Sequence, residues 1–259
     1  MESWSPSEYM RFGDERTRPS VDLASRIAVE RPGSVIDLGC GPGNSTRVLR
    51  QRWPEAQVIG LDSSSEMIDA AREDEPLEEW ILSGIEEWVP SAAFDVVFSN
   101  AALQWLPDHH DLVERLFRAV APGGALGFQI PSATFAAVRD LIHGIALEGP
   151  WAPRMSGPLG ELTMESPGLY YDCLSPHARS VDIWETEYFH VMESAEAIVD
   201  WIASTGLRPF LAVLETDEEK RRFVSRLNDM VRETYPPQLD ERVLFPFKRT
   251  FVIAYRGRG

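Results

Sequence analysis

Three glycines lie within the sequence DLGCGPGN at residues 37–44, directly after a short apolar segment. Glycine lets the backbone turn sharply and approach a bound molecule with no Cβ in the way. Several nucleotide-binding folds share this pattern, but the dinucleotide fingerprint needs Gly or Ala three residues after its second glycine. Here that residue is Asn44, and Asp37 places an acid directly before the turn. An acid at this point suits a cationic ligand better than a pyrophosphate, which prefers a neutral or positive cradle.

Further polar residues stand at the ends of the apolar segments that follow along the chain. Asp62 ends the second segment, Asn100 follows the fourth, and the sequence PGG at 122–124 precedes the fifth. A carboxylate has two acceptor oxygens, so Asp62 can accept both hydroxyl groups of a ribose. Ligands of parallel α/β sheets bind outside the carboxyl ends of the strands. We therefore expect these residues to surround one site.

The elements that must position these residues alternate between strand and helix. The predicted strands are Ser34–Leu38, Gln57–Asp62, Trp80–Leu82, Phe94–Ser99 and Ala125–Ile130, followed later by Val181–Val191 and Phe247–Tyr255. The predicted helices are Asn44–Trp53, Ser65–Arg72 with Ser65 as its N-cap, Asp108–Val120, Ala195–Ile202 and Glu218–Val231. This alternation predicts an α/β fold with a doubly wound, Rossmann-like parallel sheet. The two late strands predict a seven-stranded sheet whose last strand is antiparallel.

The charge balance limits the classes of partner. Lysine and arginine total 25 and aspartate and glutamate total 41, which gives a net charge of −16 with histidine neutral. Nucleic acids and anionic membranes both require a basic face, so neither is expected as a partner. Cys40 and Cys173 are too few for a disulfide framework or a cysteine-based zinc site. The sequence shows no signal peptide and no membrane-length apolar run, so we expect a cytoplasmic protein, with a monomer as its default state.

These residues together resemble the class I S-adenosylmethionine-dependent methyltransferases. The resemblance implies S-adenosylmethionine as cofactor, with the glycine turn at its methionine end and the acid of the second strand on the ribose. In that family the next residue and a residue of the following helix commonly line the adenine, which implies Ser63 and Met67. The family often places an acid after the third strand, but Gly84 stands there, so this contact comes from the Ile85 backbone, from Glu86, or is missing. The implied cofactor-binding residues are Asp37, Gly39, Cys40, Gly41, Asn44, Asp62, Ser63, Met67, Ile85, Glu86 and Asn100.

A narrower resemblance covers nearly the whole chain. The sequences WSPSEYMRF (4–12), ERTRP (15–19), NAALQWLPDH (100–109), YYD (170–172) and TGLRP (205–209) are similar to the trans-aconitate methyltransferase family. This likeness implies methyl transfer to one carboxylate of trans-aconitate, giving the monomethyl ester and S-adenosylhomocysteine. A carboxylate is already a nucleophile, so we expect positioning and exclusion of water to carry catalysis, with no catalytic base, metal or covalent intermediate.

A tricarboxylate substrate needs cations and hydroxyl groups in its pocket. The substrate-binding candidates are Tyr9, Arg16, Arg18, Tyr170, Tyr171, His190 and Arg208, with His109 and Arg154 behind them. We expect a single methyltransferase domain over residues 1–259. Its expected parts are an N-terminal lid and helix (1–30), a cofactor-binding core (31–131), a helical cap insertion over the strand ends (132–180), and C-terminal strands and helices that complete the sheet and acceptor pocket (181–259).

Other interpretations stay open at this point. Arg16 and Arg18 can be solvated charges beside a helix start, and the tyrosine pair at 170–171 can belong to the core. His109 can simply sit in the first turn of a helix, and Trp105 can either pack or border the acceptor site. Another small acid or a phenol could be the acceptor, and a phenol would require a general base such as His109 or His190. A non-catalytic module would bind the cofactor without turnover. If a tricarboxylate binds, the surface should be acidic except for one basic cleft at the strand ends.

Overall fold

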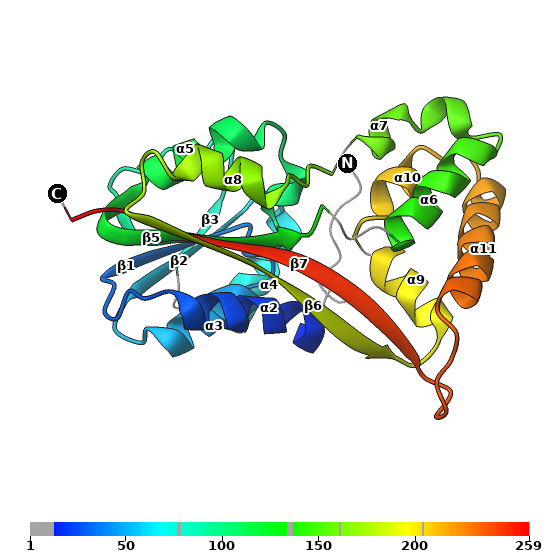
Figure 1. Ribbon diagram of the computed structural model, residues 1–259, viewed down its shortest axis with the longest axis horizontal. Coiled ribbons are helices and arrows are strands. Elements are labelled where there is room, and N and C mark those ends of the chain that lie inside the picture. The colour runs from blue at the N-terminus through cyan, green and yellow to red at the C-terminus, as the bar shows by residue number, and fades with distance from the viewer. Residues whose placement is uncertain (1–12, 77–78, 134–136, 161, 204, 259) are drawn as a thin grey trace.

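A seven-stranded sheet forms the centre of the structure, a computed structural model that describes residues 13–76, 79–133, 137–160, 162–203 and 205–258. Its strand order is β3-β2-β1-β4-β5-β7-β6 (Figure 1). The strands are β1 (Ser34–Leu38), β2 (Gln57–Asp62), β3 (Glu79–Leu82), β4 (Phe94–Asn100), β5 (Val120–Pro131), β6 (Ser180–Met192) and β7 (Val243–Tyr255). β7 runs antiparallel to both of its neighbours, and the other pairs are parallel. The predicted α/β class and the antiparallel last strand are confirmed.

Helices cover both faces of this sheet (Figure 1). One face carries α2 (Gly13–Arg26), α3 (Asn44–Arg52) and α4 (Ser65–Asp74), and the other carries α5 (His109–Arg118) and α8 (Pro167–Leu174). The short 3₁₀ turn η1 (Leu103–Trp105) precedes α5. Central parallel strands read as continuous apolar runs because both of their faces are buried. In β1, Val35 packs in the cluster around α2 and Ile36 in the cluster around α5, and neither is exposed to solvent.

A separate layer of helices stands beyond the carboxyl ends of the parallel strands (Figure 1). It contains α6 (Ala137–Glu148), η2 (Ala152–Arg154), α7 (Ser156–Leu159), α9 (Ala195–Ala203), α10 (Arg208–Ala212) and α11 (Asp217–Thr234). β6 and β7 pair with each other along their whole length, but β7 pairs with β5 only from Arg249 onward. The remainder of this two-stranded ribbon reaches into the helical layer, where Phe245 packs against Trp201 of α9 and against Tyr235 at the end of α11. The ribbon therefore connects the helical layer to the sheet.

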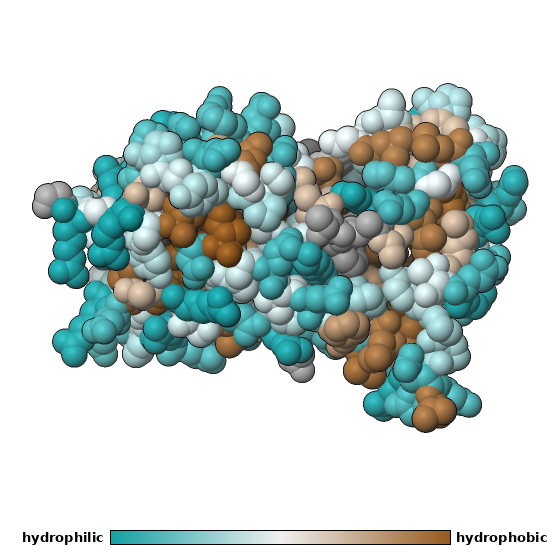
Figure 2. All heavy atoms as spheres, in the orientation of Figure 1, coloured by the Kyte–Doolittle hydropathy of each residue, from teal (hydrophilic) through white to brown (hydrophobic). Residues whose placement is uncertain are grey.

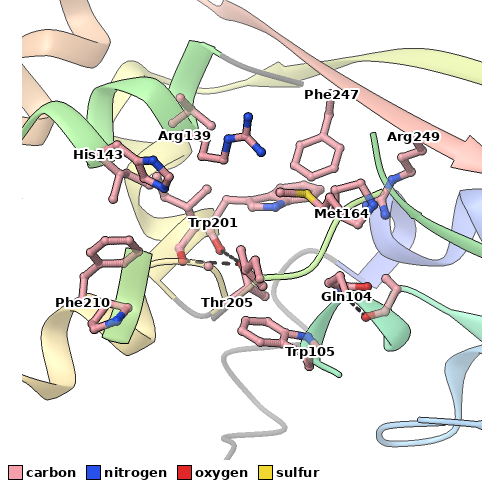
Figure 3. A pocket seen from close by; sticks show the side chains of 18 of the residues that line it. Gln104, Trp105, Arg139, His143, Met164, Trp201, Thr205, Phe210, Phe247 and Arg249 are labelled. Atoms are coloured by element: carbon pink, nitrogen blue, oxygen red, sulfur yellow. Dashed lines mark hydrogen bonds between the residues drawn. The ribbon is translucent and has the colours of Figure 1, made fainter. Parts of the chain in front are cut away.

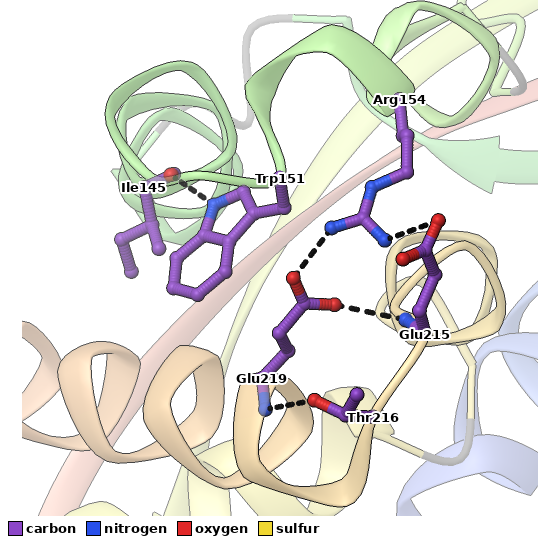
Figure 4. Close-up of polar contacts among 6 residues, drawn as sticks. All are labelled: Ile145, Trp151, Arg154, Glu215, Thr216 and Glu219. Atoms are coloured by element: carbon purple, nitrogen blue, oxygen red, sulfur yellow. Dashed lines mark hydrogen bonds and ion pairs between the residues drawn. The ribbon is translucent and has the colours of Figure 1, made fainter.

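An ion-pair network joins two segments of the helical layer (Figure 4). The guanidinium of Arg154 lies 2.6 Å from Oε1 of Glu219 and 3.1 Å from Oε1 of Glu215. Glu219 also accepts a hydrogen bond from the Glu215 N–H and donates its own N–H to the hydroxyl of Thr216, the N-cap of α11. Arg154 therefore connects η2 to the start of α11. This structural role accounts for the position of Arg154 with no contact to a substrate.

Three segments differ from the organisation expected from the sequence. Residues 167–174, expected as part of the cap, form α8 and pack on the sheet, because Tyr170 and Leu174 enter the core there. The PGG sequence at 122–124 lies inside β5, where a Cβ on Gly124 would come within 2.4 Å of a backbone oxygen. The N-cap of α4 is Ser64, which accepts a hydrogen bond from the third residue of the helix, and the predicted cap Ser65 is wrong by one position.

Polar side chains cover most of the face seen in Figure 2. A small apolar group remains exposed on the outer face of the β6–β7 ribbon, where Phe189, Val191 and Leu244 lie close together. Within the described ranges, no helix has the length and apolar character needed to cross a membrane.

Candidate active site

The glycine turn connects β1 to α3 at the carboxyl end of the sheet. Gly39, Gly41 and Gly43 have φ angles of 72°, 55° and 93°, which residues with a Cβ rarely adopt. A Cβ on Gly39 would lie 2.2 Å from the Cβ of Ala102, whereas a Cβ on Gly41 would meet nothing within 4 Å. Gly39 thus lets two loops touch, and Gly41 faces open space in which a ligand can approach the backbone.

Asp62 ends β2 directly beside this turn. Its Oδ2 accepts a hydrogen bond from the Gly41 N–H at 2.8 Å, and its Oδ1 accepts one from the Ser64 N–H at 2.9 Å. Burial raises the pKa of Asp62, and these backbone hydrogen bonds oppose that rise. Each carboxylate oxygen has a second lone pair, so Asp62 can still accept two hydroxyl groups from a ligand.

Asp37 lies beneath the turn and has no exposed surface. Its Oδ2 accepts hydrogen bonds from the hydroxyls of Ser45 and Thr46, both at 2.7 Å, while its Oδ1 has no partner among the described residues. Burial raises the pKa of Asp37 to about 6, although the two hydroxyl hydrogen bonds lower it. When ionised, the unpaired oxygen places negative charge under the turn, which favours a ligand that carries positive charge.

Other cofactor candidates lie around the same turn. Met67 is buried at the start of α4, and Ile85 is buried with its Cδ1 3.7 Å from where a Gly39 Cβ would stand. Ser63 and Glu86 are exposed, in the loops that follow β2 and β3. Cys40 is buried, and burial raises the pKa of its thiol, so it is suited to packing rather than to reaction.

The two asparagines of the set occupy different positions. Asn44 begins α3 and donates its side-chain N–H to Thr17 Oγ1 of α2 at 3.3 Å. Asn100 ends β4, where its Oδ1 accepts a hydrogen bond from Gln129 at 2.8 Å. The structure therefore brings Asp62, the glycine turn and Asn100 to one edge of the sheet, while the amide of Asn44 holds α2.

A cavity of about 200 Å³ lies between the strand ends and the helical layer (Figure 3). Its wall comes from α2, the loop after β4, the end of β5, α6, α7 and the segment that follows it, α9, α10 and β7. The polar and charged side chains in the wall are Arg16, Gln104, Arg139, His143, Thr205 and Arg249. Its aromatic side chains are Trp105, Trp201, Phe210 and Phe247. Among the described residues that line it there is no carboxylate, so the cavity is positive in a protein of net charge −16, as the expected basic cleft requires.

Two of the three arginines rest on aromatic rings. The Cζ of Arg16 is 5.4 Å from the centre of the Trp201 ring, and the Cζ of Arg249 is 4.6 Å from that of Phe247. Arg139 reaches into the cavity from α6 (Figure 3). Ring stacking restrains a guanidinium, and its planar fork of N–H donors matches the geometry of a carboxylate. The cavity is therefore suited to a small anion with more than one carboxylate.

The loop after β4 places a strained residue in the cavity wall. Ala101 has a φ of 54°, its N–H donates to the Gln129 carbonyl at 3.0 Å, and its own carbonyl accepts from Gln104 Nε2 at 2.7 Å. Strain of this kind persists only where the surrounding contacts enforce it, and it is common at functional sites. The hydrogen bonds hold this loop between the glycine turn and the cavity.

Tyr170 does not reach the cavity, contrary to its assignment as a substrate residue. It is fully buried, its hydroxyl lies 2.5 Å from Nδ1 of His109, and its ring packs edge-on against Phe128 at 5.2 Å. His109 Nε2 is 2.9 Å from the Leu103 carbonyl, so Nε2 carries the proton and Nδ1 accepts from Tyr170. Burial raises the pKa of Tyr170 and lowers that of His109. The pair joins α5 to α8, and both residues belong to the core.

Replacing Tyr170 by phenylalanine is expected to lower the free energy of unfolding by about 1–2 kcal/mol, because the buried Nδ1 of His109 loses its donor. Urea unfolding would measure this loss. Steady-state kinetics on the same variant should give unchanged Michaelis constants for both substrates. A large rise in the Michaelis constant for the methyl acceptor alone would show that Tyr170 contacts the substrate.

His190 lies behind the cavity wall and does not line it. Its ring centre is 4.7 Å from that of Trp201 and 6.2 Å from that of Phe247, the two rings that carry arginines. Burial lowers the pKa of His190 to about 4, and the nearby charges of Arg249 and Arg18 contribute. His190 is therefore neutral at pH 7 and packs between the aromatic rings.

Arg16 is the one residue of the remaining substrate candidates that lines the cavity within the described chain. Arg18 is exposed on α2, and Tyr171 is 53% exposed on α8. Arg208 begins α10 and is absent from the cavity wall. Tyr9 lies outside the described residues.

Sequence reasoning missed Arg139, His143 and Arg249. Arg249 stands in a strand whose neighbours along one face are buried, and a charged residue at such a position is a signal that could have identified it. Arg139 and His143 are four residues apart on α6 and therefore share one face of that helix. Nothing local in the sequence indicates that this face meets β7.

Known proteins of similar sequence identify the family of this chain. A family profile described as a methyltransferase domain matches residues 36–128. A protein named trans-aconitate 2-methyltransferase from Azoarcus sp. (strain BH72) is 43% identical over 258 residues, which cover 99% of this chain and 100% of that protein. The proteins of the same name from Methylobacterium radiotolerans and Escherichia coli (strain SE11) are 45% and 43% identical, over 99% of this chain and 100% and 99% of their own lengths. The chain belongs to the trans-aconitate 2-methyltransferase family.

Solved structures of lower sequence identity share the fold. The YcgJ protein of Bacillus subtilis has a TM-score of 0.60 at 15% identity, covering 93% of this chain and 100% of that chain. A putative methyltransferase from Bacillus halodurans has a TM-score of 0.59 at 13% identity, covering 93% of this chain and 99% of that chain. These likenesses support the fold of this member of the trans-aconitate 2-methyltransferase family and carry no information about its cavity.

Proposed function

We propose that this protein transfers the methyl group of S-adenosylmethionine to one carboxylate of trans-aconitate, giving the monomethyl ester and S-adenosylhomocysteine. The observation that carries the proposal is the cavity at the strand ends, which holds Arg16, Arg139 and Arg249 and no carboxylate among its described lining residues. Three guanidinium groups match three carboxylates in charge. The names of the full-length relatives support the same activity.

The residues at the glycine turn fit S-adenosylmethionine. Asp62 keeps acceptor capacity on both oxygens for the two ribose hydroxyls, and Gly41 faces open space. The buried, unpaired Oδ1 of Asp37 favours a ligand that carries ammonium and sulfonium charges and no phosphate. Ser63 follows Asp62 and Met67 lies in the first turn of α4, and both are proposed to line the adenine together with Ile85 and Glu86 of the loop after β3. The cofactor supplies a methyl group on a positively charged sulfur.

The chain's own residues bind, orient and shield the acceptor. The arginines hold carboxylates that do not react, so that the remaining carboxylate points toward the glycine turn. The restrained loop at Ala101 forms the wall between the two ligands. The helical layer excludes water, which otherwise stabilises a free carboxylate and slows its reaction. No residue has to remove a proton, because the nucleophile is already an anion.

A phenol acceptor would require a base, and the two histidines considered for that role are not placed to serve. Both ring nitrogens of His109 form hydrogen bonds, one with the Tyr170 hydroxyl and one with the Leu103 carbonyl. His190 is buried behind Trp201 and has a pKa of about 4. Of the described cavity residues, His143 is the one remaining histidine, and burial together with Arg139 lowers its pKa, which makes it a weaker base toward a phenol than an ordinary histidine. These positions favour an acid over a phenol.

The direct test uses methyl-labelled S-adenosylmethionine with trans-aconitate. We expect a labelled ester that can be extracted into organic solvent, and nuclear magnetic resonance of the product would give the esterified position. Cofactor binding without ester formation at saturating trans-aconitate would contradict the proposal and favour a non-catalytic binding module. Faster turnover of a phenol than of any carboxylic acid would contradict the choice of acceptor.

The effect of pH on cofactor binding should differ from its effect on the reaction of the acceptor. Between pH 7 and 9 we expect kcat to change less than about twofold, because the acceptor carboxylate needs no base. As the pH falls through about 6, Asp37 gains a proton and loses its charge, so the Michaelis constant for S-adenosylmethionine should rise. Initial rates from pH 5 to 9 measure both effects. A kcat that falls with a pKa near 7 would instead indicate a histidine base.

Surface charge and cysteine chemistry bear on the state of the protein in the cell. A net charge of −16 provides no basic surface for nucleic acid or an anionic membrane, and both cysteines are buried and unpaired, as suits the reducing cytoplasm. We propose a monomer as the active state. Sedimentation of the active enzyme would reveal a dimer if this inference is wrong.

A further inference from the structure

Three polar side chains form a hydrogen-bonded row across three adjacent strands, from the cofactor edge to the acceptor cavity. They are Asn100 of β4, Gln129 of β5 and Arg249 of β7, and they are 9%, 0% and 4% exposed. Asn100 and Gln129 are register partners, and Arg249 stands two residues before Phe251, the register partner of Gln129. Because side chains alternate along a strand, all three lie on the same face of the sheet.

The chemistry of the three groups fixes the direction of each hydrogen bond. A guanidinium can only donate, so the contact of 3.1 Å from Arg249 Nη1 places Oε1 of Gln129 toward the arginine. The Gln129 amide then has only its Nε2 to offer Asn100, to which it donates at 2.8 Å. Asn100 must accept this bond with Oδ1, since two amide N–H groups cannot bond to each other.

The orientation of the Asn100 amide follows from this row. With Oδ1 turned toward Gln129, the Nδ2 group points the other way, and it has no hydrogen-bond partner among the described residues. Asn100 directly precedes Ala101, which lines the cavity. Arg249 therefore determines, through Gln129, that the end of β4 presents a hydrogen-bond donor rather than an acceptor.

We propose that Gln129 is a positioning residue that turns the Nδ2 group of Asn100 toward the reacting carboxylate, and that Asn100 donates a hydrogen bond to the oxygen that is not methylated. This inference rests on the proposed function. A neutral amide suits this role, because it orients the carboxylate without pairing strongly with its negative charge. An arginine would pair with that charge and make the carboxylate a weaker nucleophile. Gln129 couples this donor to Arg249, which binds another carboxylate of the same substrate.

The test compares two substitutions of Gln129. In Gln129→Glu both side-chain oxygens accept, so Asn100 must turn its Nδ2 inward and present Oδ1 to the anionic substrate. In Gln129→Met the row is broken, but Asn100 can keep either orientation. We expect kcat/KM for trans-aconitate to fall about thirtyfold in Gln129→Glu and about threefold in Gln129→Met, with the dissociation constant of S-adenosylhomocysteine within about twofold of wild type in both. A purely structural role predicts the reverse order, since the glutamate retains a bond to Arg249 and the methionine loses both bonds.

A double-mutant cycle separates Asn100 from the added charge beside Arg249. If Gln129→Glu acts through Asn100, the same substitution in an Asn100→Ala background should lower kcat/KM further by no more than about threefold. An undiminished effect in that background would overturn the inference, and so would a selective loss of cofactor affinity. Wild-type enzyme that forms no ester would contradict the proposed function itself, whereas wild-type turnover with additive effects contradicts only the role of Gln129.

Discussion

Replacement of Arg249 by methionine is expected to lower kcat/KM for trans-aconitate about a hundredfold or more, chiefly by raising the Michaelis constant for this acceptor. Arg249 is 4% exposed and lines the cavity at the end of β7. Removing one partner of a buried, hydrogen-bonded charge pair costs about 2–5 kcal/mol, and each 1.4 kcal/mol is about a factor of ten. The Michaelis constant for S-adenosylmethionine should stay nearly unchanged, because Arg249 is absent from the glycine turn.

A matched control for this prediction is Arg232→Met on α11. Arg232 forms exposed ion pairs with Glu196 and Asp229, and none of these three residues lines the cavity. Surface pairs contribute about 0–1 kcal/mol, so this variant should keep wild-type kinetics and nearly wild-type stability. Methionine fills much of the volume of a buried arginine, and Arg249→Met should therefore fold. Equal losses for the acceptor and the cofactor would show that Arg249 supports the sheet rather than the acceptor.

The cofactor side of the site is predictable from the sequence because its signals are local. The glycine turn and Asp62 each end a short apolar strand, and parallel strands place their ends at one edge. The hydrogen bond from Gly41 to Asp62 shows this edge assembled as expected. Asn44 is the exception, because its side chain turns to Thr17 of α2, a contact that no local pattern announces.

The acceptor cavity could not be predicted in the same way, since it joins side chains separated by more than 200 residues. Arg16, Arg139 and Arg249 come from α2, α6 and β7, and they meet because the β6–β7 ribbon carries the helical layer over the strand ends. Residue type alone favours Tyr170 as a substrate residue, although its side chain is buried in the core. Residue type does not favour Arg249, because it lies among the buried residues of β7.

The net negative charge of the protein affects how an anionic acceptor reaches this cavity. A net charge of −16 repels a tricarboxylate at long range, so binding depends on the three arginines within the wall. Salt screens exposed charges more than buried ones. Added salt should therefore weaken the long-range repulsion before it weakens the arginine contacts, and no electrostatic steering of the acceptor is available to the enzyme.

Replacement of Asp62 by alanine is expected to weaken the binding of S-adenosylhomocysteine about a hundredfold or more. The carboxylate is positioned to accept both ribose hydroxyls, and hydrogen bonds to a charged group contribute about 1.5–3 kcal/mol each. The substitution also releases the N–H groups of Gly41 and Ser64, which loosens the turn that must receive the cofactor. Calorimetric titration measures the affinity, and unchanged affinity would show that the ribose assignment is wrong.

The control for Asp62 must lose the same kind of backbone contact without touching the cofactor site. Asp95 provides it, because its Oδ2 accepts from the N–H groups of Gly33 and Ser34 at 2.7 and 3.1 Å, at the opposite end of β1. Asp95→Ala should lower the free energy of unfolding by about 1–3 kcal/mol and leave the affinity for S-adenosylhomocysteine unchanged. Asp62→Ala should differ from it only in affinity. If both variants lose stability alike and only Asp62→Ala loses cofactor binding, the loss arises at the carboxylate of Asp62 and the turn that it holds, and not from a weakened sheet.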